Sequence, residues 1–300
     1  MIFPRFINEG ATIGIVAPAG KIEAEVIGFS KEFLHKQGFR VVTGEHLLSS
    51  YHQFAGSDRQ RIADMQHILN STDVDVVMCA RGGYGTNRII KNLDFTHFLQ
   101  NPKWIVGFSD ITVLHSKLQN NLGVASVHGP MPKNFSGRSA GDEDLTNLFN
   151  ILKGILPTYE IPAHPLNRKG SAEGELIGGN LSVLYSLRGT SLDFDPHEKI
   201  LFIEDVGEKL YHLDRMMINL NNGGVLKHLR GLIVGEFSEM IDSDIPYGSN
   251  PYEIINDAVK EYDYPVLFDF PAGHGEVNQP LVFGKRVSLN ITQQKGVLEF

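Results

Sequence analysis

Cysteine is almost absent from this sequence, since Cys79 is the only one in 300 residues. A single cysteine cannot form an internal disulfide, and it excludes any metal site built from several cysteines. Because Cys79 lies in the apolar run DVVMCA, we expect a buried structural thiol rather than a reactive one.

Long apolar runs and an excess of positive charge are missing as well. No segment approaches ~18 uninterrupted apolar residues, and the chain does not start with a basic region followed by a long apolar stretch. We therefore expect a cytoplasmic protein that does not bind membranes. The 27 basic and 35 acidic residues give a net charge of −8, which argues against a general nucleic-acid binder.

Nucleotide and metal motifs are also lacking. The segment GGYGTNR begins like a dinucleotide fingerprint, but Arg88 stands where the third glycine should be, and no GxxxxGK[ST] occurs. None of the 12 histidines belongs to an HExxH pair or a His/carboxylate cluster with metal-ligand spacing. We expect no cofactor and no metal. The glycines of RGGYG then indicate either close backbone approach or a tight turn before a helix near Thr86.

The first half of the chain alternates apolar runs with helical segments. The runs ATIGIVAPAG, FRVVTGEH, DVDVVMCA, KWIVGFS and VASVHGP are continuous and end in Gly, Pro or Ser, which is typical of buried parallel strands. The clearest helix spans about 57–70 and starts with a Ser57/Gln60 capping box. Its apolar face is formed by Ile62, Met65, Ile68 and Leu69. This order predicts an α/β fold with a doubly wound, mostly parallel sheet, whose functional loops lie at the carboxyl ends of the strands.

Length and composition predict two domains. Pro, Gly and charged residues crowd together between about 156 and 179 without a sustained period. We therefore expect an amino-terminal α/β domain over 1–157, a linker over 158–178, and a smaller mixed α/β domain over 179–300. In the second domain the pattern predicts helices near 180–189, 209–221 and 252–262, and strands near 199–205 and 231–237.

Ser109, in GFSD, lies where a predicted strand ends and a predicted helix begins. Such a turn projects a hydroxyl outward beside free helical N–H groups and suits a nucleophile, but serine is also a favoured N-cap residue. Position alone favours the cap. The G-x-S-x-G elbow of α/β-hydrolases does not match, because Ile111 takes the place of its last glycine.

A serine nucleophile needs a base within hydrogen-bond reach. His274 lies in the glycine-rich loop PAGHGEVNQP, with little apolar context that would make it a core histidine. His128 ends the strand after Ser109 and is a rival. His115 is interpreted as a surface or packing residue.

The base in turn needs an orienting carboxylate. Glu204 follows three apolar residues in LFIED, the pattern of a buried strand that delivers a carboxylate at its end. A structural ion pair explains Glu204 alone equally well, and Asp205 and Glu208 are close enough to compete.

Several segments together resemble, across nearly the whole chain, the LD-carboxypeptidase family of serine peptidases, which also contains microcin self-immunity proteins. They are ARGGYG, GFSD, HGPMP, GELIGGNLSVL, LFIEDVGEKLYHLDRMM and PAGHGEVNQPLVFGK. In that family the serine of GFSD is the nucleophile, the glutamate of the IED strand end orients the base, and the histidine of the GHG loop is the base. The resemblance thus implies these roles for Ser109, Glu204 and His274, with a site between the two domains.

The resemblance implies further features. The first domain should be similar to class I glutamine amidotransferases, and the protein should be a homodimer. Backbone amides, here those of Asp110 and Gly83, should form the oxyanion hole. A carboxypeptidase must also hold a terminal carboxylate, for which Arg81 is our candidate, although an ion pair explains Arg81 equally well.

The implied activity is hydrolysis of the L,D amide bond to terminal D-alanine in cytoplasmic muropeptides. One alternative is hydrolysis of a peptidyl-nucleotide antibiotic, whose flat base favours an aromatic platform. Trp104 opens a strand and should be buried, whereas Tyr84 and Tyr159 could stack. The alternative from another class is a non-catalytic ligand-binding protein, which would have no need of all three predicted catalytic residues.

Overall fold

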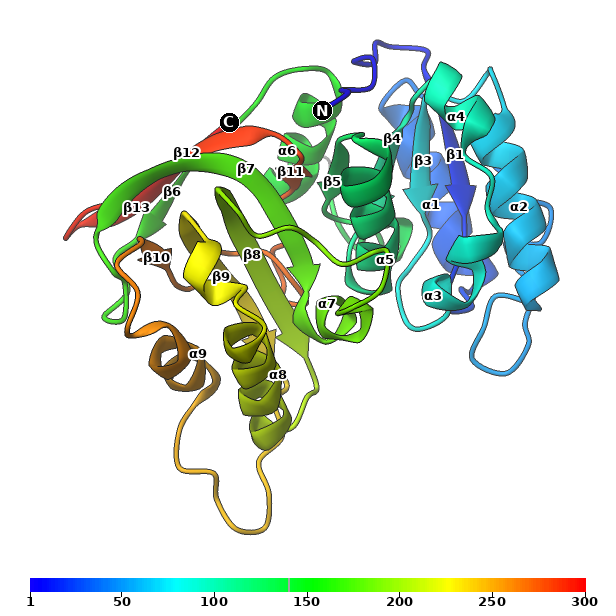
Figure 1. Cartoon of the computed structure of the whole chain (residues 1–300). Helices are drawn as coiled ribbons and strands as arrows, with labels where there is room; N and C mark the ends of the chain where they lie inside the picture. The colour runs from blue at the N-terminus through cyan, green and yellow to red at the C-terminus, as the bar shows by residue number, and fades with distance from the viewer. Residues whose placement is uncertain (140) are drawn as a thin grey trace. The chain divides into compact units, whose positions relative to one another are not determined.

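The computed structural model describes residues 1–139 and 141–300 and divides into two compact units (Figure 1). Unit 1 comprises residues Met1–Leu156 and Gln279–Val282, and unit 2 comprises Pro157–Asn278 and Phe283–Phe300. Each unit combines a β-sheet with α-helices, so the predicted α/β class is confirmed.

The sheet of unit 1 has the strand order β11-β5-β4-β3-β1-β2. The five apolar runs form β1 (Thr12–Val16), β2 (Arg40–Thr43), β3 (Val76–Cys79), β4 (Trp104–Gly107) and β5 (Ser126–His128), and their pairings are parallel as predicted. The strands β1, β3 and β4 are buried along their whole length, which explains their continuous apolar sequence. The edge strand β2 alternates between exposed and half-buried residues.

The helices of unit 1 are α1 (Ala24–Lys36), α2 (Asp58–Asn70), α3 (Thr86–Ile89), α4 (Thr96–Gln100), α5 (Thr112–Ser116) and α6 (Glu143–Leu152). The predicted capping box of Ser57 and Gln60 is confirmed at the start of α2. The prediction that Ile62 belongs to the buried face of α2 is wrong. Ile62 is only partly buried, whereas the neighbouring Arg61 is buried on that face. A charged side chain therefore lies among the apolar residues of α2.

The sheet of unit 2 has the order β10-β9-β8-β7-β12-β13-β6, parallel from β7 to β10 and antiparallel from β7 to β6. Its strands are β6 (Thr158–Pro162), β7 (Gly170–Asn180), β8 (Lys199–Val206), β9 (Gly231–Ser238), β10 (Val266–Leu267), β12 (Arg286–Ile291) and β13 (Lys295–Glu299). The strand β11 (Leu281–Phe283) belongs to the other sheet. The two sheets together are thus mixed rather than uniformly parallel.

The predicted linker over 158–178 is wrong, because β6 and most of β7 occupy it. The edge strand β6 buries only alternate residues, so it carries no continuous apolar run. The glycines of β7 reflect packing against β8 rather than a flexible connection. A Cβ on Gly178 would lie 1.9 Å from the carbonyl oxygen of Phe202.

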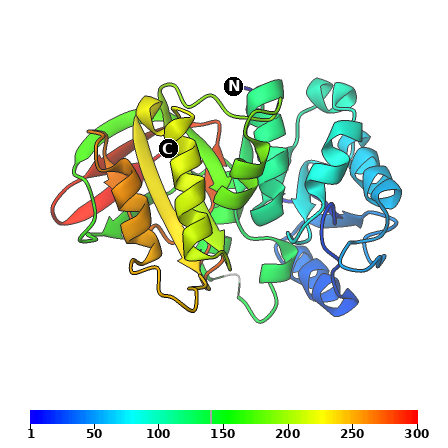
Figure 2. The same ribbon diagram turned by 60° about the horizontal axis from the view of Figure 1, so that its bottom comes forward.

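The three predicted helices of unit 2 are confirmed as α7 (Leu181–Leu187), α8 (Leu210–Asn222) and α9 (Pro251–Val259). Figure 2 shows α8 and α9 side by side against the sheet. Apolar side chains of these helices and of β8 and β9 form one buried cluster. Among the described residues, no helix is long and apolar enough to cross a membrane.

Candidate active site

Ser109 lies directly after β4, where a short 3₁₀ turn, Ser109–Ile111, leads into α5. The residue in the N-cap position of this turn is Phe108, so the capping interpretation of Ser109 is not supported. Ser109 has a φ of +64°, a left-handed conformation that costs a non-glycine residue about 1–3 kcal/mol and that clusters at functional sites. Its side chain is partly exposed. The nucleophile interpretation therefore fits the local geometry better than the cap.

The glycine turn over 82–85 packs directly against this serine. A Cβ on Gly82 would lie 2.7 Å from the Cβ atom and 2.8 Å from the Oγ atom of Ser109, so only glycine fits there. The same Cβ position lies 3.4 Å from the backbone nitrogen of Asp110. Gly83 follows with a φ of +104° and is exposed. Close backbone approach thus explains these glycines, and the two predicted oxyanion donors belong to segments in mutual contact.

The carboxylate of Asp110 connects the serine turn to α3. Its Oδ2 atom accepts a hydrogen bond of 2.8 Å from the backbone N–H of Thr86, the first residue of that helix. Asp110 is buried, and this burial raises the pKa of its carboxyl group. The helix start near Thr86 is confirmed.

Arg81 precedes the glycine turn, and its Nη1 atom donates a hydrogen bond of 2.9 Å to the carbonyl oxygen of Lys21. Within the described residues Arg81 forms no ion pair, so the ion-pair explanation is not supported. The backbone N–H of Lys133 donates to the carbonyl oxygen of Ala80, beside Arg81. Burial, together with the nearby charge of Arg81, lowers the pKa of Lys133. Lys133 was not among the residues predicted from the sequence, although it lies in HGPMPKN, directly after a predicted functional loop.

The rival bases are core residues. His115 is completely buried, with its Nδ1 atom 2.8 Å from the Oγ atom of Ser126 and its Nε2 atom 2.8 Å from the carbonyl oxygen of Gly107. Burial lowers the pKa of His115 to about 4. It is therefore a packing residue, and the surface interpretation is wrong. His128 is also completely buried, with its ring edge-on to Phe108 at 5.8 Å between centroids.

Unit 2 brings two predicted site residues together. The Nδ1 atom of His274 lies 2.7 Å from the Oε2 atom of Glu204. Glu204 is completely buried near the end of β8, while 19% of the His274 side chain is exposed. A carboxylate can only accept, so Nδ1 carries the donated proton and neutral His274 keeps Nε2 as a proton acceptor. This is the arrangement that a general base requires.

Two carboxylates leave no space for a side chain at the glycines beside His274. A Cβ on Gly273 would lie 3.0 Å from the Oε2 atom of Glu204, and a Cβ on Gly275 would lie 1.7 Å from the Oε2 atom of Glu236. The backbone N–H of Glu236 also donates to the carbonyl oxygen of Ala272, which anchors the loop to β9. Burial raises the pKa of Glu236, and the charges of Asp269 and Glu204 add to this effect. Glu236 was not among the residues predicted from the sequence, although GLIVGEF repeats the strand-plus-carboxylate pattern of LFIED.

The two competitors of Glu204 have other partners. Asp205 accepts hydrogen bonds from the Nδ2 atom of Asn180 at 2.9 Å and from the backbone N–H of Ser182 at 2.8 Å, so it joins β8 to the start of α7. Burial and the charge of Glu204 raise the pKa of Asp205 to about 7. The Oε2 atom of Glu208 lies 2.6 Å from the Nδ1 atom of His212.

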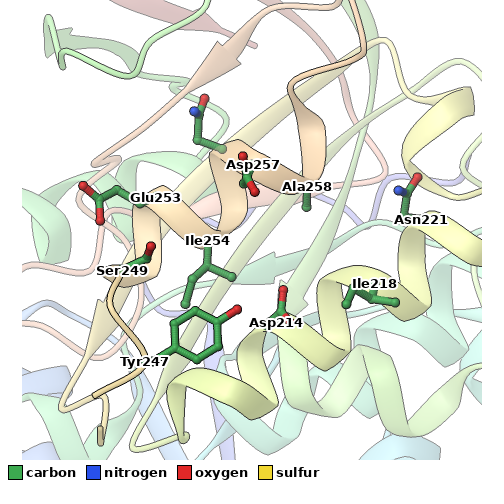
Figure 3. A pocket seen from close by; sticks show the side chains of 10 residues that line it. Asp214, Ile218, Asn221, Tyr247, Ser249, Glu253, Ile254, Asp257 and Ala258 are labelled. Atoms are coloured by element: carbon green, nitrogen blue, oxygen red, sulfur yellow. The ribbon is translucent and has the colours of Figure 1, made fainter. Parts of the chain in front are cut away.

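A hollow of about 510 Å³ lies between α8 and α9 (Figure 3). Figure 3 shows Asp214 on α8 opposite Tyr247 and Ile254. None of the predicted site residues lines this hollow. It therefore provides no argument about catalysis.

Comparison with known proteins gives a consistent result over both units. A model of the LD-carboxypeptidase N-terminal domain matches residues 13–129, and a model of the LD-carboxypeptidase C-terminal domain matches residues 173–289. The chain is 32% identical to a probable murein peptide carboxypeptidase of Bacillus subtilis, over 99% of this chain and 94% of that protein.

Solved structures share the fold as well. The muramoyltetrapeptide carboxypeptidase from Oxalobacter formigenes is 29% identical and has a TM-score of 0.87, with 96% of this chain and 98% of that chain covered. The microcin C7 self-immunity protein MccF in complex with aspartyl sulfamoyl adenosine is 20% identical, with a TM-score of 0.87 over 100% of this chain and 99% of that chain. The second similarity is one of fold alone.

Proposed function

The chain belongs to the LD-carboxypeptidase family, and on this premise we propose that it removes the terminal D-alanine from muropeptide tetrapeptides by cleaving an L,D amide bond. It is a carboxypeptidase of the serine peptidase class. The murein substrates named for the Bacillus and Oxalobacter relatives support the choice of substrate. The single observation that carries the chemistry is the hydrogen bond between His274 and Glu204, because it prepares an imidazole to accept a proton.

We propose that Ser109 is the nucleophile, His274 the base and Glu204 the group that orients the base. The Oγ atom of Ser109 attacks the carbonyl carbon while the Nε2 atom of His274 accepts the hydroxyl proton. Collapse of the tetrahedral intermediate breaks the C–N bond, and His274 returns the proton to the leaving amine of D-alanine. His274 then acts as the base again and activates a water molecule, which attacks the acyl-enzyme. This step releases the shortened peptide and restores Ser109. The left-handed backbone of Ser109 supports its assignment.

We propose that the backbone N–H groups of Asp110 and Gly83 stabilise the oxyanion. One such donor is worth about 3 kcal/mol when it is aimed at the developing charge. The close contact of Gly82 with Ser109 supports this choice. For the terminal carboxylate of the substrate we propose Arg81, whose guanidinium can bind both oxygens at once, with Lys133 as a second cation nearby.

Finer features also remain proposals. We propose that unit 1 is similar to class I glutamine amidotransferases, which its parallel strand order β5-β4-β3-β1-β2 supports. The homodimer stays a prediction from the family resemblance. The cytoplasmic location and the lack of a metal or cofactor requirement stay predictions from the sequence.

Hydrolysis of a peptidyl-nucleotide is the second candidate, favoured only by the shared fold of the adenosine-bound self-immunity protein. The predicted burial of Trp104 is confirmed. Of the two predicted aromatic platforms, Tyr159 is wrong, because it is buried. Tyr84, which is 52% exposed, is left. A non-catalytic binding protein would have no use for the His274–Glu204 hydrogen bond.

The deciding experiment incubates the purified protein with a muropeptide tetrapeptide and follows the loss of one alanine by mass spectrometry. The Ser109→Ala variant serves as the control for contaminating peptidases. Absence of this product with active wild-type protein, together with hydrolysis of a peptidyl-adenylate analogue, would establish the second candidate instead.

A further inference from the structure

Arg61 is a charged residue in an unexpected place. It projects from the buried face of α2, and its side chain has no exposed surface. A guanidinium keeps its charge and carries five N–H donors, so its burial is unfavourable unless other groups satisfy it. The contacts of Arg61 therefore indicate what it does.

Arg61 joins two loops that follow neighbouring strands. Its Nη1 atom donates to the carbonyl oxygen of Pro18, in the loop after β1, and to that of Gly85 at 2.9 Å, in the glycine turn after β3. Its Nη2 atom pairs with the carboxylate of Asp58, and its guanidinium carbon lies 5.0 Å from the ring centroid of Phe54. One rigid, planar group thus spans the two loops.

The glycine turn is shaped around this guanidinium. Gly85 has a φ of +143°, and a Cβ on it would lie 2.5 Å from the Nη1 atom of Arg61. The next residue, Thr86, donates its N–H to Asp110, the neighbour of Ser109. At its other end the turn is bonded to the loop after β1, since the N–H of Gly20 donates to the carbonyl oxygen of Gly82 at 3.0 Å. Arg61 is therefore one of the contacts that fix this turn.

We propose that Arg61 is a positioning residue, which holds the glycine turn against the loop after β1 so that the amides of Gly83 and Asp110 keep their positions beside Ser109. The inference rests on the proposed function, because only oxyanion stabilisation gives these amides a role. Arg61 itself does not touch the substrate. Donors of this kind act through their exact placement in the transition state, so their displacement lowers kcat and leaves KM nearly unchanged.

The test replaces Arg61 by lysine, which keeps the charge but lacks the planar fork of donors. We expect Arg61→Lys to lower kcat by about 10–100-fold, the effect of misplacing reacting groups by ~1 Å, with KM within about twofold. A small fluorophosphonate that labels the nucleophilic serine should react more slowly by a similar factor, since its phosphoryl oxygen uses the same amides. Circular dichroism measures the fraction of folded protein, and rates are expressed per folded molecule. A substitution that only destabilises the fold would then leave these rates unchanged.

Arg88→Ala is the matched control. The guanidinium of Arg88 also pairs with Asp58 and lies 5.7 Å from the centroid of the same Phe54 ring, on the exposed side. Among the described contacts it does not reach the carbonyl oxygens of Pro18 or Gly85, so kcat should stay within about twofold of wild type. If Arg61→Lys does not fold, Asp58→Ala takes its place. Asp58 is 37% exposed and anchors Arg61 from outside, and its loss should lower kcat more than Arg88→Ala does.

The positioning role is wrong if folded Arg61→Lys keeps its kcat and its labelling rate, or, where that variant does not fold, if Asp58→Ala behaves like Arg88→Ala. A loss confined to KM would also contradict it. The proposed function is tested separately by Ser109→Ala. Activity in that variant would overturn the nucleophile, whereas an inactive Ser109→Ala beside a fully active Arg61→Lys would overturn only the role of Arg61.

Discussion

The Nδ1 atom of His274 lies 2.7 Å from a carboxylate oxygen of completely buried Glu204, while part of the imidazole stays exposed. A second histidine, His212, pairs with Glu208 through its own Nδ1 atom at 2.6 Å, and there both side chains are partly exposed. The two pairs have the same chemistry but differ in burial. A buried partner holds an imidazole in one tautomer and orientation more strongly than a hydrated one, because it has no competing water.

This contrast gives the first prediction. Ser109→Ala, Glu204→Ala and His274→Ala should each lower hydrolysis of the tetrapeptide at least ~1000-fold, and the losses should not add, because the residues act as one unit. His212→Ala is the matched control and should retain near-normal turnover. Steady-state kinetics on folded variants measure the effect. Near-normal turnover by Ser109→Ala, with contaminating peptidase excluded, would make the nucleophile assignment wrong.

The first half of the fold was predictable because its signals are local. The buried strands β1, β3 and β4 are short continuous apolar runs, and Ser109 lies at the end of one of them. In contrast, β6 and β7 were not predicted, because an edge strand and a glycine-rich strand resemble a linker in composition.

Two parts of the site could not be predicted from the sequence, for a different reason. The burial of Arg61 could not be predicted because hydrophobic periodicity counts only apolar residues, and the Nη1 atom of Arg61 donates to carbonyl oxygens of two distant loops. The position of Glu236 depends on how β9 lies beside β8 and beside the loop of Gly275, which no local pattern contains. Motif resemblance found Glu204 and His274, but their hydrogen bond joins residues 70 positions apart.

The second prediction concerns the contact between Gly82 and Ser109. Gly82→Ala should lower kcat by about 100-fold, because the new methyl group would displace a nucleophile whose Oγ atom lies 2.8 Å from the Cβ position. Gly28→Ala is the control: it lies in α1 with no atom near its Cβ position, and the change should stabilise the fold by about 0.5–1 kcal/mol. Kinetics and urea unfolding of both variants measure the two effects. Equal kinetics of the two variants would show that the close contact does not position Ser109.

The third prediction concerns pH. The pKa of Asp205 is raised from its usual 3.8 to about 7, first by burial and then by the charge of Glu204. A raised pKa means that the folded state holds a proton which the unfolded state has lost, so this contribution to stability is present below about pH 4 and disappears as the pH rises through 7. The free energy of unfolding of wild type minus that of Asp205→Asn should therefore fall between pH 5 and pH 8. Urea titrations at both pH values measure it. A difference that stays constant or grows would mean that Asp205 is ionised throughout, held by its hydrogen bonds to Asn180 and Ser182.

The fourth prediction separates serine from metal chemistry. Incubation with EDTA followed by gel filtration should leave tetrapeptide hydrolysis unchanged, because the proposed acyl transfer needs only protein groups. Inhibition by the chelator that zinc reverses would refute the serine mechanism.

The last prediction concerns the choice between the two substrate classes. The kcat/KM for a tetrapeptide ending in D-alanine should exceed that for a peptidyl-adenylate analogue by at least ~10-fold, a gap of about 1.4 kcal/mol in transition-state binding. The reason is that stacking of a base would supply ~1–3 kcal/mol, and of the two predicted platforms Tyr159 is buried in β6, which leaves Tyr84 alone to provide it. The peptide ending in L-alanine should be a poor substrate, because inversion moves the methyl group into the space of the carboxylate that Arg81 is proposed to hold. Arg81→Ala should accordingly weaken the preference for the D-epimer. All three compounds compete in one assay with product detection by mass spectrometry, and equal cleavage of the two epimers or a preference for the analogue would favour the nucleotide-directed alternative.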